Sequence, residues 1–392
     1  METVYIVGMA RTPIGAFQGA LSSFSAPRLG SIAIEAALKR ASVDPKDVSE
    51  VIMGEVLTAG VGQAPARQAS IYSGIPDTVP CLTVNKVCGS GMKAVMLGMQ
   101  SIQLGESSIV VAGGMESMSQ APYLIPKARS GLRMGNQALI DSMIHDGLWD
   151  PYHNQHMGNC GDLCAKEMNF TREAQDAFAI ESFKRAQAAQ KKGHFESEIT
   201  PVTVKDRKGN ESQVVEDEGP AKVKFDKIPN LKPAFGKEGT VTAANASSIN
   251  DGAAVMILAG EKAVKEKGLK PLAKLRGTGQ NAHQPEWFTT APAKAMQRAI
   301  EKSQWQLKDV DLFEVNEAFA VVTMAAQKEL QLSADQVNCL GGAIALGHPI
   351  GASGARIVMT LVNALRIKGL KRGCAGICIG GGEATSICVE TV

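Results

Sequence analysis

The run Asn85-Lys86-Val87-Cys88-Gly89-Ser90-Gly91 offers a nucleophile in a setting that could activate it. The apolar stretch 80–84 before it predicts a short buried strand, and apolar residues at helical spacing follow over 92–102. Cys88 is therefore expected on a strand-to-helix turn, where small neighbours let a substrate approach closely. Unpaired N–H groups at a helix start favour a thiolate, so we expect a lowered thiol pKa. The alternative interpretation is a buried cysteine that serves as a small apolar residue.

Three further residues, His348, Cys378 and Asn316, could complete such a site. His348 is surrounded by small residues that leave its ring little to pack against, and a Cys–His pair is the minimal equipment for a thiolate nucleophile. Cys378 ends a strand predicted over 376–379, and a second thiol could act as a base or acid toward a carbon acid. Asn316 also ends a strand and could hold a water. The alternative for each is a structural role, as a satisfied histidine, a core cysteine or a capping asparagine.

A second group of residues has spacings that resemble a metal site: His153, His156, Cys160 and Cys164. No Cys-x-x-Cys pair accompanies them, and a structural zinc site would usually contain one, so no metal site is predicted. The run 277–279 is Gly-Thr-Gly, which lacks the third glycine and the acidic residue of a dinucleotide-binding fingerprint.

Strands alternate with helices near both ends of the chain, which predicts an α/β fold with a mainly parallel sheet covered on both faces. In the first part, the patterns predict strands over 4–9, 51–57 and 108–112 and helices over 29–41 and 64–73.

An internal repeat is the clearest sign of domain organisation. Residues 46–55 align without a gap with 308–317, 90–95 match 353–358, and 113–116 match 380–383. Between the copies lie a polar stretch, a long helical pattern over 171–192 and a charged stretch rich in Pro and Gly. We therefore expect an N-terminal half (1–118, completed by 251–269), an inserted loop domain (119–250) and a C-terminal half (270–392). Duplicated halves usually pack about a pseudo-two-fold axis, which would bring Cys88 and His348 together.

Composition limits the function classes. The 392 residues carry a net charge of +2, with 44% hydrophobic and 20% charged residues, as in a globular enzyme. Neither a nucleic acid nor a membrane is expected as the main partner. Eight cysteines without a disulfide framework favour a reducing compartment. No secretory signal, transmembrane run, or C-terminal peroxisomal or retention tripeptide is visible, so we expect a cytoplasmic protein.

Four blocks of this sequence, 85–91, 316–319, 347–354 and 378–382, resemble the signature blocks of the thiolases, and the resemblance spans the whole chain. The segments 156–158 and 245–247 resemble the short-chain, acetoacetyl-CoA type. The resemblance implies the thiolase fold, with two repeated α/β halves in layered packing and an inserted loop domain. It also implies an acyltransferase that condenses two acetyl-CoA molecules reversibly to acetoacetyl-CoA and CoA.

The resemblance also implies a role for each residue. Cys88 is the nucleophile that carries the acetyl group, and His348 takes its proton. Cys378 removes a proton from the second acetyl-CoA, whose enolate oxygen lies against His348 and a water held by Asn316. The backbone N–H groups of Cys88 and Gly380 hold the other oxyanion, and such donors are typically worth about 10²–10³ in rate each.

Coenzyme A is implied as a substrate and product, with no further cofactor. By position, its pantetheine channel is lined by Leu148, His156, Met157, Phe235, Ala243, Ser247, Ala318 and Phe319. Its phosphates are expected near Lys222, Lys224 or Lys227. Pro220 stands where potassium-binding relatives have a tyrosine, which argues against a potassium site. The resemblance further implies a homotetramer built as a dimer of dimers.

Other functions remain open at this point. A 3-ketoacyl-CoA thiolase of broader chain length is the second enzyme reading, and Phe288, where many bacterial members have methionine, leaves 2-methyl-branched substrates open. A decarboxylating ketoacyl synthase would need a histidine in place of Cys378. A non-catalytic CoA- or lipid-binding relative would lack at least one catalytic residue, and none is missing here.

Overall fold

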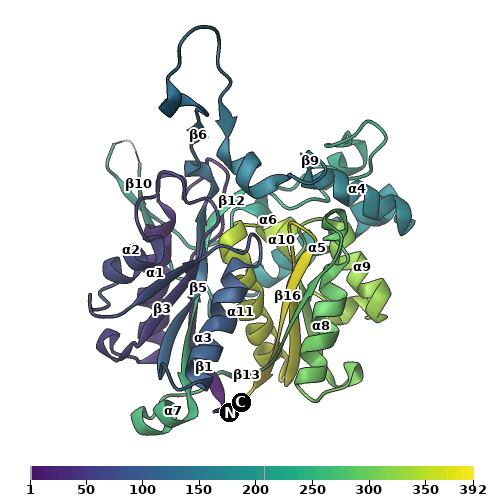
Figure 1. Cartoon of the computed structure of the whole chain (residues 1–392). Coiled ribbons are helices and arrows are strands. Elements are labelled where there is room, and N and C mark those ends of the chain that lie inside the picture. The colour runs from purple at the N-terminus through teal and green to yellow at the C-terminus, as the bar shows by residue number, and fades with distance from the viewer. Residues whose placement is uncertain (1, 207) are drawn as a thin grey trace.

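The computed structural model describes residues 2–206 and 208–392. Ten strands of the described chain form one mixed sheet that bends into two wings with helices between and outside them (Figure 1). The N-terminal wing contains β1 (Val4–Arg11), β2 (Gly15–Ala16), β3 (Glu50–Gly54), β4 (Cys81–Val84), β5 (Ile109–Ser117) and β12 (Asn250–Gly260). The C-terminal wing contains β13 (Ala273–Ala282), β14 (Leu312–Val315), β15 (Arg372–Ile379) and β16 (Glu383–Thr391).

The two wings repeat one strand order, which confirms the sequence repeat. The N-terminal order is β1-β12-β5-β3 with β4 at the edge, and the C-terminal order is β13-β16-β15-β14. The aligned residues 46–55 and 308–317 thus end in equivalent strands, β3 and β14. A short antiparallel pairing of Tyr5 and Ile6 in β1 with Lys274 and Ala273 in β13 joins the wings.

The prediction of a mainly parallel sheet is wrong. Parallel pairing joins β3 to β4, β3 to β5, and β14 to β15, whereas β12 and β16 pair antiparallel with both of their neighbours. The glycine turn 380–382 connects β15 directly to β16, and so short a turn can join only antiparallel strands. The α/β layering itself is as predicted, because helices cover both faces of each wing.

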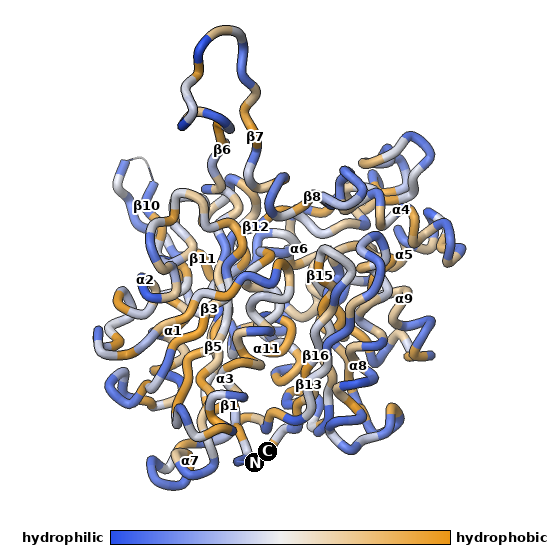
Figure 2. Tube along the Cα trace, in the orientation of Figure 1, coloured by the Kyte–Doolittle hydropathy of each residue, from blue (hydrophilic) through white to orange (hydrophobic). Residues whose placement is uncertain are grey.

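Helices form three layers around the wings. The central layer holds α3 (Ser90–Gln103) and α11 (Ile350–Lys368); α1 (Ala26–Ala41) and α2 (Pro65–Tyr72) cover the outer N-terminal face, and α8 (Ala291–Lys302) and α9 (Ala320–Leu330) the outer C-terminal side. Figure 2 shows hydrophobic residues concentrated along the strands and inner helices. Helix α11 is long and apolar enough to cross a membrane, but 89% of that stretch is buried inside this fold, as for a core helix.

Two strands differ from their predicted form. The strand predicted over 51–57 ends at Gly54, because the N–H groups of Val56 and Leu57 turn to the carboxylate of Glu116, each at 3.1 Å. Strand β4 was expected to be buried, but it lies at the sheet edge with one neighbour, and Leu82 is 46% exposed. Periodicity alone cannot separate an edge strand from a central one.

The region between the halves lies over one end of both wings, at the top of Figure 1. Its helices are α4 (Met157–Glu167), α5 (Arg172–Lys191) and α6 (Gly219–Lys222), and the Thr171 side chain caps α5 by accepting the Ala174 N–H at 3.1 Å. Its strands pair only locally: β6 (Tyr123–Leu124) with β7 (Ile140–Asp141), β8 (Trp149–Asp150) with β9 (Gln155–His156), and β10 (Val202–Lys205) with β11 (Glu211–Val214). The β6–β7 hairpin projects away from the body in Figure 1. This region therefore adds loops to the end of the sheet without extending it.

Candidate active site

A strained turn presents Cys88 between β4 and α3. Val87 has a φ of +46°, which is unfavourable for a β-branched residue. Side chains hold the turn: Asn85 Oδ1 accepts the Val87 N–H at 3.0 Å, and Ser90 Oγ accepts the Lys86 N–H at 2.8 Å while donating to the Val87 carbonyl at 2.6 Å. The predicted strand-to-helix turn is confirmed.

The second repeat contributes Cys378 and Gly380 to the same place. Gly89 packs directly against the Ile379 side chain, and a Cβ at residue 89 would collide with it. The Cys378 side chain is fully buried, and burial, with a smaller contribution from Cys88, raises the pKa of its thiol. The Gly380 N–H lowers the pKa of the Cys88 thiol by hydrogen bonding. The glycine at 89 is thus what lets the two halves meet here.

His348 is held in one tautomer. Ser353 Oγ donates its proton to the Pro349 carbonyl at 2.9 Å, so it must accept from His348 Nδ1–H at 2.6 Å. The Nε2 atom therefore carries the lone pair, and Asn316 Nδ2 lies 3.4 Å from it. Asn316 Oδ1 is buried without a partner among the described residues. The imidazole is thus oriented to accept a proton through Nε2.

The ionisation of Cys88 differs from the expected lowering of its thiol pKa. Burial raises the pKa of the Cys88 thiol to about 11, although the backbone N–H groups of Gly380 and Cys88 lower it. The predicted lowering by a helix start is therefore wrong, because desolvation outweighs the N–H groups. Burial, with the charge of Arg356, lowers the pKa of His348 to about 3. At neutral pH the resting site holds a neutral thiol beside a neutral imidazole.

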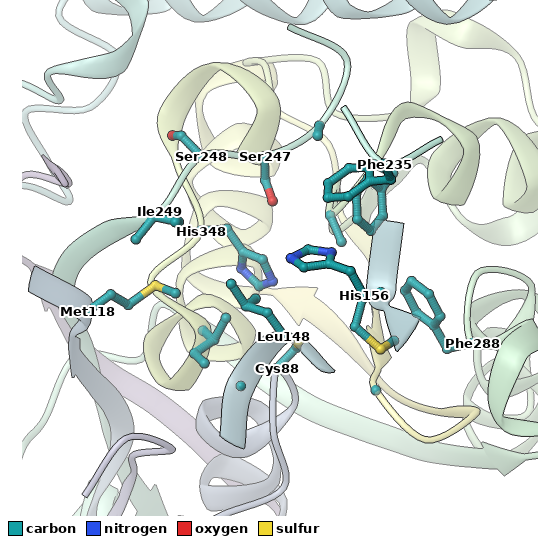
Figure 3. Close-up of a pocket in the computed structure, with 17 residues that line it drawn as sticks. Cys88, Met118, Leu148, His156, Phe235, Ser247, Ser248, Ile249, Phe288 and His348 are labelled. Carbon is teal, nitrogen blue, oxygen red and sulfur yellow. The ribbon is translucent and has the colours of Figure 1, made fainter. Parts of the chain in front are cut away.

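Cys88 and His348 open into one cavity of about 260 Å³. Figure 3 shows the His348 and His156 rings pointing toward each other, with Cys88 below them. Most of the residues predicted for the pantetheine channel line this cavity, together with Gly380: Leu148, His156, Met157, Phe235, Ser247, Ala318 and Phe319. His156 stacks on Phe235 with ring centroids 4.5 Å apart, and its Nδ1 accepts the Gly158 N–H at 3.1 Å. The walls are mostly apolar, which suits a thioester chain.

Ala243 lies outside this cavity, in a neighbouring hollow of about 360 Å³. Lys222, Lys224 and Lys227 line the same hollow, whereas Ala246 and Ser248 border both spaces. The two spaces therefore adjoin, and together they run from the thiol to a basic surface.

The residues considered for a metal site have other partners. His153 Nδ1 lies 2.8 Å from Asp150 and its Nε2 lies 3.7 Å from Glu286. Gln155 donates to the buried Cys160 at 3.5 Å. Within residues 2–206 and 208–392, no three His, Cys, Asp or Glu side chains gather as metal ligands would.

Several lining residues were not predicted from the sequence: Met118, Gly147, Ala246, Ser248, Ile249 and Ile350. Ser248 and Ile249 directly follow the predicted Ser247, and Ile350 follows His348 by two positions, so adjacency could have found them. Met118 directly follows β5 at the end of the first repeat, whose counterpart in the second repeat leads to Gly380. Phe288, noted for its size, also lines the cavity with its ring centroid 6.2 Å from that of Phe319.

Known proteins match this chain over its full length. The family model described as "Thiolase, N-terminal domain" matches residues 4–262, and "Thiolase, C-terminal domain" matches 269–391. Acetyl-CoA acetyltransferase 2 of Arabidopsis thaliana is 53% identical over 99% of this chain and 96% of its own length. Acetyl-CoA acetyltransferase of Saccharomyces cerevisiae is 50% identical over all of both chains.

Solved structures agree with these sequence matches. The crystal structure of the Bacillus anthracis acetyl-CoA acetyltransferase has a TM-score of 0.97 and 40% identity, covering 100% of this chain and 99% of that one. Acat5 thiolase of Ascaris suum in complex with coenzyme A has a TM-score of 0.94 and 45% identity, covering 100% of both chains. With both family models and a doubled fold that brings Cys88 to His348, the chain belongs to the thiolase family.

Proposed function

We propose that this chain is an acetyl-CoA acetyltransferase, which condenses two acetyl-CoA molecules reversibly to acetoacetyl-CoA and CoA. The observation that carries the proposal is the meeting of the Cys88 thiol, the lone pair of His348 Nε2 and the Gly380 N–H at one apolar cavity. The relatives at about half identity bear this activity in their names.

The first half-reaction acetylates Cys88. His348 Nε2 takes the thiol proton as the sulfur attacks the acetyl carbonyl, and the N–H groups of Cys88 and Gly380 bind the oxyanion. The C–S bond to CoA then breaks, and Cys378 gives its proton to the departing CoA sulfur. Acetyl-Cys88, free CoA, a Cys378 thiolate and a protonated His348 remain.

The second half-reaction forms the carbon–carbon bond. The Cys378 thiolate takes a methyl proton from the second acetyl-CoA, and the protonated Nε2 of His348 with a water on Asn316 binds the enolate oxygen. The carbanion attacks the acetyl carbonyl of acetyl-Cys88, the Cys88 sulfur leaves, and His348 returns its proton.

CoA binds along the path from the thiol to the lysines. Its pantetheine arm lies against the residues of the apolar cavity and Ala243, and its phosphates meet Lys222, Lys224 and Lys227. The loop domain (119–250) supplies most of these contacts, and the two halves, 1–118 with 251–269 and 270–392, supply the reacting groups.

Three measurements test the function. Purified protein should cleave acetoacetyl-CoA with free CoA, and faster than it cleaves 3-ketooctanoyl-CoA; preference for the longer substrate would favour the broader 3-ketoacyl-CoA thiolase. Incubation with acetyl-CoA should add one acetyl group to Cys88, read by peptide mass spectrometry. Cys88→Ala should abolish both, and a variant that keeps full thiolysis would refute the covalent route.

The assembly is a homotetramer, a dimer of dimers. The projecting segment around β6 and β7 exposes large apolar residues that a monomer would leave in water: Tyr123 (64%), Ile125 (48%), Leu132 (50%), Met134 (95%) and Leu139 (60%). The exposed edge strand β4 offers a second surface. Light scattering on the purified protein should give four subunits, and substituting Met134 and Leu139 with serine should yield dimers.

The cytoplasm is the compartment we assign. A Gibberella zeae relative, 49% identical over 100% of this chain, has "cytosolic" in its name, and free cysteines suit a reducing environment. Fractionation of host cells with an antibody to this chain tests the assignment.

A further inference from the structure

The segment that carries His348 is held by buried side chains. Ile344 N–H donates to Glu317 Oε2 at 3.1 Å, His348 N–H donates to Asn250 Oδ1 at 2.9 Å, and Gly351 N–H donates to Glu116 Oε2 at 2.8 Å. Ile344 and Gly351 lie in the first turns of α10 (Ala343–Leu346) and α11, where N–H groups lack partners within the helix. The three acceptors are at most 1% exposed.

Two of these acceptors come from the other half of the molecule. Glu317 follows β14, but Asn250 begins β12 and Glu116 lies in β5, which both belong to the wing that carries Cys88. The Glu116 carboxylate also accepts the N–H groups of Val56 and Leu57 at 3.1 Å each. One side chain thus ties the exit of β3 to the start of α11, directly after His348.

Two glycines of this segment lie in close contact with Glu116 and Asn250. A Cβ on Gly351 would lie 2.7 Å from Glu116 Oε2 and 3.0 Å from the Glu55 Cα. Gly347 has a φ of +110°, and a Cβ there would lie 2.5 Å from the Asn250 side chain. The backbone on both sides of His348 is therefore in direct contact with Asn250 and Glu116, which we call the clamp.

We propose that Glu116 is a positioning residue, whose carboxylate sets the distance between His348 and Cys88 across the two halves. The proposal rests on the proposed function, in which His348 Nε2 takes the Cys88 proton. Proton transfer needs near hydrogen-bonding distance, and a misplacement of about 1 Å can cost roughly 10²-fold in rate. Glu116 touches neither the cavity nor a substrate, so it acts through the backbone of α11.

A neighbouring carboxyl group provides the matched control. Glu55 is also fully buried and lies beside Glu116. Its side chain makes no hydrogen bond, because both carboxylate oxygens lack a partner among the described residues. Glu55→Gln and Glu116→Gln each remove one buried carboxyl group at nearly constant volume. Glu116 accepts backbone N–H groups with both oxygens, so only Glu116→Gln places an amide NH₂ against such a donor and loses part of these hydrogen bonds.

The test compares the two variants at pH 8.5, where Glu116, with a pKa of about 7, is ionised. Glu116→Gln should lower kcat for acetoacetyl-CoA cleavage about 10–100-fold with KM within about twofold, whereas Glu55→Gln should keep wild-type kcat. Unchanged kcat in Glu116→Gln, an equal loss in Glu55→Gln, or a loss confined to KM would overturn the proposal.

Alkylation of Cys88 by iodoacetamide gives a readout without substrate. The Glu116 charge helps to raise the Cys88 pKa, so its removal alone would speed alkylation. Displacement of His348 predicts the opposite, a rate several-fold slower than wild type, and a faster rate would overturn the proposal. This readout applies even if the wild type fails to cleave acetoacetyl-CoA, a failure that would count against the proposed function alone. If Glu116→Gln does not fold, Glu116→Asp, whose shorter side chain draws the carboxylate back from the Gly351 N–H, should give the same loss of kcat and of alkylation rate.

Discussion

Replacing Glu55 with glutamine should stabilise this protein strongly at alkaline pH and little at acid pH. The Glu55 carboxyl is fully buried, and burial with the nearby Glu116 charge raises its pKa from 4.5 to about 9. Between these two values the folded protein keeps the Glu55 proton while the unfolded chain releases it. Stability contributed by this group therefore falls as pH rises through that window.

The size of the effect follows from proton linkage. Each pH unit between the two pKa values lowers the wild-type free energy of unfolding by about 1.4 kcal/mol through this one proton. From pH 5.5 to pH 8.5 the loss amounts to about 4 kcal/mol, which a glutamine at position 55 does not suffer. All other groups titrate in both proteins, so their contributions cancel in the difference.

Urea unfolding of wild type and Glu55→Gln at the two pH values measures this difference. The variant should gain several kcal/mol relative to wild type between pH 5.5 and pH 8.5, while Glu106→Gln, which changes an exposed carboxyl, should follow wild type. An advantage of Glu55→Gln that is the same at both pH values would refute the argument, because the buried carboxyl would then titrate no differently in the folded chain.

Three further predictions concern the site. Ser353→Ala removes the acceptor of His348 Nδ1–H and should lower kcat about tenfold with KM unchanged, since a buried unpaired N–H costs about 1–3 kcal/mol; steady-state kinetics within twofold of wild type would contradict it. Because the Cys88 pKa is about 11, the rate of its alkylation by iodoacetamide in the free enzyme should keep rising from pH 7 to pH 10, and a plateau below pH 8 would show a preformed thiolate. Lys227→Glu should raise KM for CoA about tenfold at low salt and less at high salt, with kcat for acetoacetyl-CoA cleavage unchanged; a KM independent of salt would place the phosphates elsewhere.

The repeat allowed the convergence of the site to be predicted. The match of 90–95 with 353–358 puts His348 at the position of Asn85, so pseudo-two-fold packing of the halves predicted its approach to Cys88, and the structure opens both residues into one cavity. The strand-to-helix turn around Cys88 is formed by residues adjacent in the chain, so the sequence could predict it. The glycine run 380–382 marked the turn after β15, whose first N–H acts on Cys88.

What the sequence could not predict depends on distant neighbours. Apolar runs indicate burial but not strand pairing. The sequence therefore did not predict that β12 and β16 pair antiparallel with their neighbours, or that β4 is an exposed edge strand. The thiol pKa was mispredicted because the N–H groups of a helix start are local, whereas desolvation comes from the whole cavity. The sequence also could not show that the space divides into two adjoining hollows with Ala243 in the second, because position along the loop domain does not fix which hollow a residue faces.

The position of β12 in the sheet has a consequence for folding during synthesis on the ribosome. β12 lies between β1 and β5, but residues 118–249 must be synthesised before it. Until residue 260 of 392 has emerged, the nascent chain holds β1 and β5 with unpaired edges facing a gap that nothing yet fills. A chaperone that shields exposed strand edges would have its longest opportunity in that interval.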